Sequence, residues 1–200
     1  LLAQVAVSKY ADHCPLHRQE TIFRRHGAEL SRKTMCDWMR QCAELVSPVF
    51  DRMKEQVLLS KALQTDDTPV NVLDPSLPHA RTGRIWTYVG DRDHPYTVYD
   101  YTPTRSRDGP DAFMKNFHGY LQADAYSGYD ELYRNSAREI VEVACWAHVR
   151  RKHFEAQSSD PMRATVMLAY IRLLYDVERE ARDLSLRGEA RKSLRQSKSV

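Results

Sequence analysis

Two aspartates that follow short apolar runs, far apart in the chain, are the residues best suited to do chemistry. Asp66 lies in Leu63–Val70 (Leu-Gln-Thr-Asp-Asp-Thr-Pro-Val), and Asp124 lies in Tyr120–Tyr129 (Tyr-Leu-Gln-Ala-Asp-Ala-Tyr-Ser-Gly-Tyr). A carboxylate at the end of a buried strand is costly unless it is hydrogen-bonded, paired or bound to a cation. Two of them on neighbouring strands are the usual protein ligands of magnesium in phosphoryl chemistry. The pair is therefore a candidate site for Mg²⁺ or Mn²⁺.

Both aspartates also have a structural interpretation. Asp66 suits a strand-end carboxylate that caps the Thr68-Pro69 turn, and Asp124 precedes the turn-forming Ser127-Gly128. From the residues alone, this interpretation is the favoured one. Asp67 is not expected to share a metal with Asp66, because adjacent residues of a strand point to opposite faces.

Further candidates follow the last apolar run of the central region. Cys145 and His148 are separated by two residues, but a lone pair of ligands cannot fill a tetrahedral zinc site, and the sequence has no second pair. We interpret Cys145 as a buried strand-end residue and His148 as a residue that contacts phosphate or orients a ligand. Arg150, Arg151 and Lys152 are candidate phosphate contacts, with a solvated helix start as the alternative.

Composition limits what kind of protein presents these residues. The chain has 200 residues, 42% of them hydrophobic, which is typical of a globular domain, alone or with an appendage. No apolar run is long enough to span a membrane, and no signal peptide is visible. The four cysteines form no Cys-x-x-Cys pair, which favours reduced thiols in a cytosolic setting. A net charge of +3 says little about partners, so only local basic patches indicate nucleic acid.

Residues 1–60 are predicted to form helices arranged like a helix-turn-helix region. Pro15 opens a second helix, Gly27 ends it, and Ser31 caps a third. Pro48 is expected to interrupt this third helix. Basic residues cluster around the turn and are candidates for DNA contact: Arg24, Arg25, Arg32 and Lys33. The same layout is common in proteins that do not bind DNA, so a purely structural role is the alternative.

The central region alternates strands and helices. Strands are predicted at 62–67, 84–90, 96–101, 120–124 and 140–145, and helices at 107–117 and 129–136. Thr68-Pro69 is expected to end the first strand, with its continuation over Val70–Leu73 as the alternative. A helical crossover brings the fourth strand back parallel to the first, which places Asp66 and Asp124 at the same end. This order predicts an α/β fold with a mixed five-stranded sheet, the topology of ribonuclease-H-like folds.

The remainder is predicted to be helical. One long amphipathic helix starts at Pro161. Apolar residues become scarce beyond Leu186, so 188–200 is expected to be frayed or disordered. The three tryptophans, Trp38, Trp86 and Trp146, are predicted to be core residues.

Several segments together carry a resemblance to a known family: Lys9–Glu20, Leu30–Trp38, Asp66–Val70, Asp124–Tyr129 and Cys145–Lys152. They resemble the transposases of the insertion-sequence-66 (IS66) family, bacterial enzymes of the DDE class with a ribonuclease-H-like core. Asp-Asp-Thr-Pro-Val stands where the family has Asp-Glu-Thr-Pro-Val, and Cys-Trp-Ala-His matches a block of the family. The resemblance covers almost the whole chain and favours the catalytic interpretation of both aspartates.

The resemblance implies cleavage and joining of DNA strands, with Asp66 and Asp124 as catalytic acids that hold two divalent ions, Mg²⁺ or Mn²⁺. It implies double-stranded DNA as partner (transposon ends and target), a homo-oligomer in a transposition complex, no membrane, and a cytoplasmic location in bacteria, at the nucleoid when bound to DNA. Residues 1–60 would then be the DNA-contacting helical region, 61–156 the catalytic core, and 157–200 the start of a helical insertion with a basic tail.

The third acid of the family is a Glu in an Asn-Asn-x-x-Glu-Arg segment that follows the helical insertion. The chain has no Asn-Asn pair. We therefore expect the third acid to lie beyond residue 200 and the chain alone to be inactive or severely impaired. Two other functions stay open: a catalytically dead DNA-binding relic, and a metal-dependent nuclease of the same fold.

Overall fold

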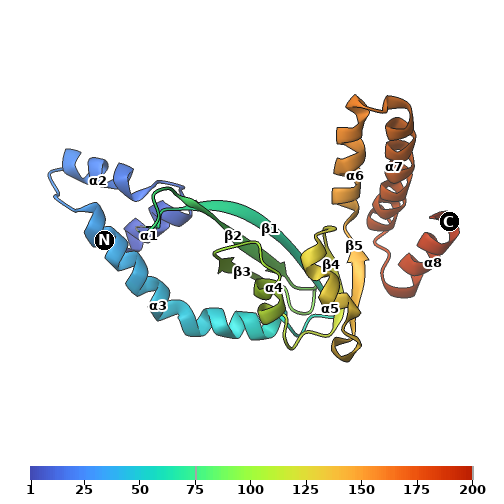
Figure 1. The fold of residues 1–200 in the computed structure, drawn as a ribbon, viewed down its shortest axis with the longest axis horizontal. Helices are drawn as coiled ribbons and strands as arrows, with labels where there is room; N and C mark the ends of the chain where they lie inside the picture. The colour runs from blue at the N-terminus through green and yellow to red at the C-terminus, as the bar shows by residue number, and fades with distance from the viewer. Residues whose placement is uncertain (75, 200) are drawn as a thin grey trace. The chain divides into compact units, whose positions relative to one another are not determined.

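The structure is a computed structural model that describes residues 1–74 and 76–199 (Figure 1). The chain divides into two compact units. The first comprises Leu1–Ser60 with Val89–Val98, and the second comprises Lys61–Tyr88 with Tyr99–Val200. Within the described residues, no helix is both long and apolar enough to cross a membrane.

Three helices build most of the first unit: α1 (Leu2–Tyr10), α2 (Leu16–Arg25) and α3 (Arg32–Val57). Their core is a cluster of Val5, Leu16, Met35 and Met39, one or two residues from each helix. The predicted cap is present, because the Ser31 side chain accepts a hydrogen bond from the Thr34 N–H.

The predicted interruption at Pro48 is wrong, since α3 continues through it to Val57. A proline inside a helix leaves a carbonyl one turn earlier without its N–H donor. Residues 43–52 are all exposed, so water can satisfy that carbonyl. The cost of the missing bond is then small enough for the flanking helix to persist.

A five-stranded mixed sheet runs in the order β3-β2-β1-β4-β5. Its strands are β1 (Ala62–Val72), β2 (Arg81–Val89), β3 (Thr97–Thr102), β4 (Gly119–Ala123) and β5 (Ile140–Ala144). The predicted parallel pairing of the first and fourth strands is confirmed, with Leu63 opposite Leu121. β4 and β5 are also parallel, and Ala123 lies opposite Ala144. β4 starts at Gly119 with a φ of +130°, where an added Cβ would lie 2.6 Å from the Lys61 carbonyl oxygen.

Thr68-Pro69 does not end β1, which continues to Val72, so the alternative of a continued strand is the correct one. The register with β4 covers Ala62–Gln64, and β4 ends at Ala123. Pro69 therefore lies beyond the reach of β4, where its missing N–H removes no bond to that strand.

Short helices follow the sheet strands: α4 (Asp108–Phe113), η1 (Ser127–Tyr129), α5 (Asp130–Arg134) and η2 (Ser136–Arg138). The core beneath them contains Trp86, Tyr88, Phe117, Leu121 and Tyr129, all buried. Tyr88 and Phe113 stack with their ring centroids 3.6 Å apart. This packing fixes the helical crossover between β3 and β4 against the sheet.

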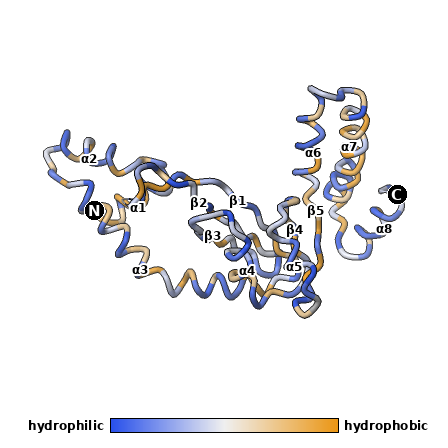
Figure 2. The backbone as a smooth tube through the Cα atoms, viewed as in Figure 1, coloured by the Kyte–Doolittle hydropathy of each residue, from blue (hydrophilic) through white to orange (hydrophobic). Residues whose placement is uncertain are grey.

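The last part of the second unit is helical: α6 (Trp146–Glu155), η3 (Ala156–Ser158), α7 (Pro161–Asp183) and α8 (Gly188–Lys198). The expected disorder of the tail is wrong for the described residues, because α8 occupies most of it. Hydrophilic residues dominate α8 (Figure 2), and none of its described side chains is buried. Ion pairs hold it instead: Glu178 accepts from Arg191 and Arg195, and Glu180 accepts from Lys198. Val200 lies outside the described residues.

The tryptophan prediction is correct in part. Trp86 is fully buried, and Trp38 is partly buried against the helical core of the first unit. Trp146 is 49% exposed, so it is not a core residue. It is the first residue of α6, directly after the sheet, and its side chain is partly in solvent.

Candidate metal centre

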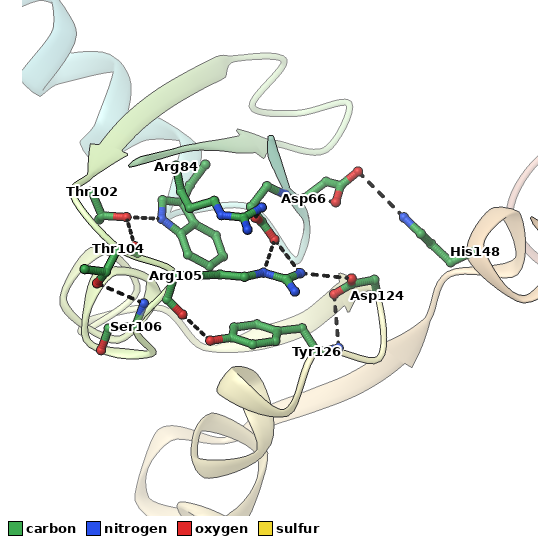
Figure 3. A network of polar contacts seen from close by, with 11 residues as sticks. Asp66, Arg84, Thr102, Thr104, Arg105, Ser106, Asp124, Tyr126 and His148 are labelled. Carbon is green, nitrogen blue, oxygen red and sulfur yellow. Dashed lines mark hydrogen bonds and ion pairs between the residues drawn. The ribbon is translucent and has the colours of Figure 1, made fainter. Parts of the chain in front are cut away.

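Three metal-ligating side chains meet at one edge of the sheet. One ligand atom from each of Asp66, Asp124 and His148 lies within 4.8 Å of the others (Figure 3). Asp66 comes from β1, and Asp124 directly follows β4. The parallel pairing of these strands brings the two carboxylates together, as the strand order predicts.

The two carboxylates are held differently. The Asp66 side chain is 57% exposed, and its Oδ1 accepts a hydrogen bond of 2.9 Å from the Asp67 N–H. The Asp124 side chain is 23% exposed, and its Oδ1 accepts one of 3.1 Å from the Tyr126 N–H. Asp124 therefore sits in a turn, as its structural interpretation suggested, and its Oδ2 lies 3.5 Å from Arg105 Nη2.

His148 is positioned by the start of α6. The Cys145 N–H donates to the Ala123 carbonyl oxygen over 3.2 Å, which ties the residue before α6 to the end of β4. His148, in the first turn, then places Nε2 3.7 Å from Asp66 Oδ2. Its buried Nδ1 has no hydrogen-bond partner within the part of the chain that the structure describes. An imidazole oriented by packing in this way is a third donor for a cation.

Asp67 points away from this centre, as strand alternation predicts. Its side chain is only 2% exposed. Arg84 donates to its Oδ2 over 2.9 Å, and Arg105 donates to its Oδ1 over 2.7 and 2.9 Å. These two arginines were missed from the sequence. They could have been sought in the sequence as partners of Asp67, because a buried carboxylate needs a cation or hydrogen-bond donors to compensate its charge.

Arg105 also approaches the centre itself. Its Nη2 lies 3.5 Å from Asp124 Oδ2, and its guanidinium lies 4.1 Å from the centroid of the Tyr126 ring. Burial lowers the pKa of Arg105, but the hydrogen bonds and charge of Asp67 and the charge of Asp124 outweigh this and raise its pKa overall. Burial raises the pKa of Tyr129, because it disfavours the charged form of the phenol, and the charges of Asp124 and Asp67 add to the effect. The Arg105 side chain is thus a permanent cation beside the two acids.

A cavity of about 460 Å³ opens next to the centre. Asp124, Arg105 and His148 line it, together with Lys152 from the next turn of α6. Arg150 and Arg151 are exposed on the same helix but do not line the cavity. Of the three basic candidates in this helix, the structure therefore brings one to the site.

The basic candidates of the first unit are all exposed. Arg24 and Arg25 form the last turn of α2, and Arg32 and Lys33 form the first turn of α3. The backbone N–H of Arg32 donates to Glu20 over 3.0 Å, which fastens the start of α3 to α2. The four side chains stay available for an anionic partner.

The donor set suits a divalent cation. Two carboxylates supply the hard oxygen ligands that Mg²⁺ and Mn²⁺ prefer, and the imidazole nitrogen is a softer third donor. Around the centre, the carboxylates of Asp66, Asp67 and Asp124 outnumber the guanidiniums of Arg84 and Arg105 by one. The residual negative charge favours a cation between Asp66 and Asp124.

Comparisons with known proteins identify one matching family model and several relatives in one bacterium. The family model described as "Transposase IS66 family" matches residues 1–200. Among curated proteins of Sinorhizobium fredii, the chain is 34% identical to "Uncharacterized protein y4qI" over 212 residues and 31% identical to "Uncharacterized protein y4hP" over 221 residues. These matches cover 100% of the chain and 39% of each relative. A third, "Uncharacterized protein y4jD", is 29% identical over 212 residues, which is 41% of its length.

Proposed function

The chain belongs to the IS66 transposase family, and from this premise we propose that it carries the catalytic core of an enzyme that cleaves and joins DNA strands. The observation that supports the proposal most is the meeting of Asp66, Asp124 and His148 within 4.8 Å. If the two aspartates only capped turns, their side chains would not need to lie close together. Binding of a common cation requires that they do.

We propose that the sheet is of the ribonuclease-H-like type. The order β3-β2-β1-β4-β5 and the parallel β1–β4 pair support this assignment, since one acid lies on β1 and the other directly follows the adjacent β4. In this scheme residues 61–156 form the catalytic core. Residues 1–60 contact DNA through the exposed arginines and lysine of α2 and α3, and residues 157–200 begin a helical insertion.

Asp66 and Asp124 hold the divalent cation in this proposal, Mg²⁺ or Mn²⁺, and His148 supplies a nitrogen donor or orients a ligand. A bound divalent ion activates the attacking oxygen and stabilises the leaving oxygen in phosphoryl transfer. Lys152, at the rim of the cavity beside Asp124, suits contact with a DNA phosphate. The remaining partners are those of a transposition complex: transposon ends, target DNA and further copies of the protein.

The proposal is tested with a full-length transposase that carries this chain as its matching segment. Labelled DNA with the transposon ends is incubated with Mg²⁺ or Mn²⁺, and cleavage and strand joining are measured. We expect Asp66→Asn and Asp124→Asn each to reduce both products to background, because each removes a charged ligand. Asp51→Asn, which changes an exposed acid on α3, is the matched control and should retain activity.

The outcomes separate the alternatives. Wild-type rates in both site variants would refute the proposed centre. Hydrolysis without joining of DNA ends would indicate a nuclease, and DNA binding without cleavage by the unsubstituted protein would indicate a non-catalytic relic.

A further inference from the structure

The buried carboxylate beside Asp66 is bound from two sides. Arg84, on β2 next to β1, donates to Asp67 Oδ2 over 2.9 Å. Arg105, in the segment between β3 and α4, donates to Oδ1 through Nε at 2.9 Å and Nη2 at 2.7 Å. Both oxygens of Asp67 therefore have charged donors, which compensates for the loss of water around a side chain that is 2% exposed.

The same nitrogen of Arg105 reaches the second acid. Nη2, which donates to Asp67, also lies 3.5 Å from Asp124 Oδ2. Asp67 directly follows Asp66 on β1, whereas Asp124 follows β4. One guanidinium thus connects the acidic segment of β1 with the acid that follows β4, the two parts that the candidate metal centre needs together (Figure 3).

Tyr126 completes a closed set of contacts around Asp124. The Tyr126 hydroxyl donates to the carbonyl oxygen of Arg105, and its ring lies under the Arg105 guanidinium at 4.1 Å. The Tyr126 N–H donates to Asp124 Oδ1. Each oxygen of Asp124 therefore has a fixed neighbour, and the rotation of this carboxylate is restricted from both sides.

The loop that carries Arg105 is itself braced. Thr102 accepts a hydrogen bond of 2.7 Å from the buried Trp86 indole and donates one of 2.7 Å to the Thr104 carbonyl oxygen. Arg105 follows directly. The backbone three residues before Arg105 is therefore anchored to the buried core by these hydrogen bonds.

Building on the proposed function, we propose that Arg105 is a positioning residue of the metal centre: it holds the Asp124 carboxylate in the orientation that faces Asp66 and His148. Two effects of Arg105 on a bound cation oppose each other. Its charge repels the cation, and its contacts pre-form the ligand geometry. If Arg105 only compensates the charge of Asp67, neutralising both residues should leave the metal affinity unchanged. If Arg105 positions Asp124, the same change should weaken metal binding.

A charge-balanced double variant separates these roles. Asp67→Asn combined with Arg105→Gln removes one negative and one positive charge, so the net charge of the centre is unchanged. Binding of Mn²⁺ to the chain is measured by titration calorimetry, and unfolding by urea is measured in parallel. We expect Mn²⁺ to bind about tenfold more weakly in the double variant, as is typical when a residue that orients a ligand is lost.

Arg105→Lys is the second variant. It keeps the positive charge beside Asp67, but an ammonium group cannot span Asp67 and Asp124 as a planar guanidinium does. We expect Mn²⁺ affinity to fall several-fold here as well. If the double variant does not fold, as judged by circular dichroism, Arg105→Lys decides the question alone. Asp51→Asn serves as the control that should bind Mn²⁺ like the wild type.

Wild-type affinity in the double variant or in Arg105→Lys would overturn the inference and leave the proposed function intact. Failure of the unsubstituted chain to bind Mn²⁺ saturably, or binding that survives Asp124→Ala, would overturn the proposed centre itself and the inference with it. The two failures are therefore distinguishable in one set of titrations.

Discussion

Asp66 and Asp67 are adjacent in the chain and have opposite environments. The first is 57% exposed and belongs to the candidate metal centre, while the second is 2% exposed and belongs to an ion-pair network. The alternation of side chains along β1 explains the contrast. The Asp66 carboxylate is accessible from solvent, and the charge of the buried Asp67 carboxylate is compensated by two arginines.

This contrast predicts unequal effects on stability. Asp67→Ala leaves Arg84 and Arg105 without their buried partner, and we expect it to lower the free energy of unfolding by about 2–3 kcal/mol. The loss is below the ~3–5 kcal/mol typical of a broken buried pair, because both arginines keep some contact with water. Asp66→Ala, the control at the adjacent position, should change stability by less than about 0.5 kcal/mol. Urea unfolding of both variants measures the difference, and equal losses would contradict it.

The two aspartates of the site could be predicted from the sequence, whereas His148 and Arg105 were harder to identify. Asp66 and Asp124 were recognisable because each follows an apolar run and precedes turn-forming residues. His148 was a weak candidate, because its position depends on the bond between Cys145 and Ala123, and that bond depends on strand register. Arg105 lies in an irregular segment with no periodicity, so nothing local distinguishes it from the other arginines.

At the scale of elements, strand order was predictable and element ends were not. The helical crossover requires a parallel β1–β4 pair, and this constraint is independent of local detail. Pro48 and Pro69 misled because the rules for proline assume that a lost N–H bond is needed. Solvent around α3 in one case, and the early end of β4 in the other, remove that need.

The docking of α8 gives an element-scale prediction. Hydrogen bonds from Arg195 and, after the opposing effect of burial, from Arg191 lower the pKa of Glu178 from its ordinary value of 4.5 to about 2. A carboxyl with a lowered pKa stabilises the docked state above its unfolded pKa, and this contribution is lost as the pH falls from about 4.5 towards 2. We expect α8 to detach over this range, and also at about 1 M NaCl near neutral pH, where the Debye length is about 3 Å.

Amide hydrogen exchange of residues 188–198 measures this detachment. Glu178→Gln should accelerate exchange in α8 at neutral pH and low salt, because it removes the charge shared by Arg191 and Arg195. Glu189→Gln is the matched control, since Glu189 is 85% exposed and pairs with Lys192 inside α8. Exchange that responds to neither Glu178→Gln nor salt would show that ion pairs do not hold this helix.

At the scale of the whole molecule, cation binding and catalysis are expected to be separable. The chain spans about two fifths of the length of the relatives it matches, and its sequence has no Asn-Asn-x-x-Glu-Arg segment. We expect residues 1–200 to bind Mn²⁺ through Asp66 and Asp124 but to join no DNA ends. Binding to the folded state alone should raise the unfolding free energy by about 2.7 kcal/mol at a Mn²⁺ concentration of 100 times the dissociation constant.

Thermal unfolding with and without Mn²⁺, reversed by a chelator, measures this stabilisation. A strand-transfer assay of the same sample measures catalysis. Efficient strand transfer by residues 1–200 would contradict the expectation that a third acid beyond residue 200 is required. His148 would then be the first candidate for the third ligand.

The network around Asp67 has a consequence for anyone who recombines relatives of this protein. Positions 67, 84 and 105 lie on three separate segments but are joined by hydrogen bonds from both arginines to the one carboxylate, so they form a connected set. Where the parents differ at these positions, a chimera whose crossover point falls between them would leave the buried acid or one of the partly exposed arginines without its partner. Breakpoints before residue 61 or after residue 160 keep the set whole.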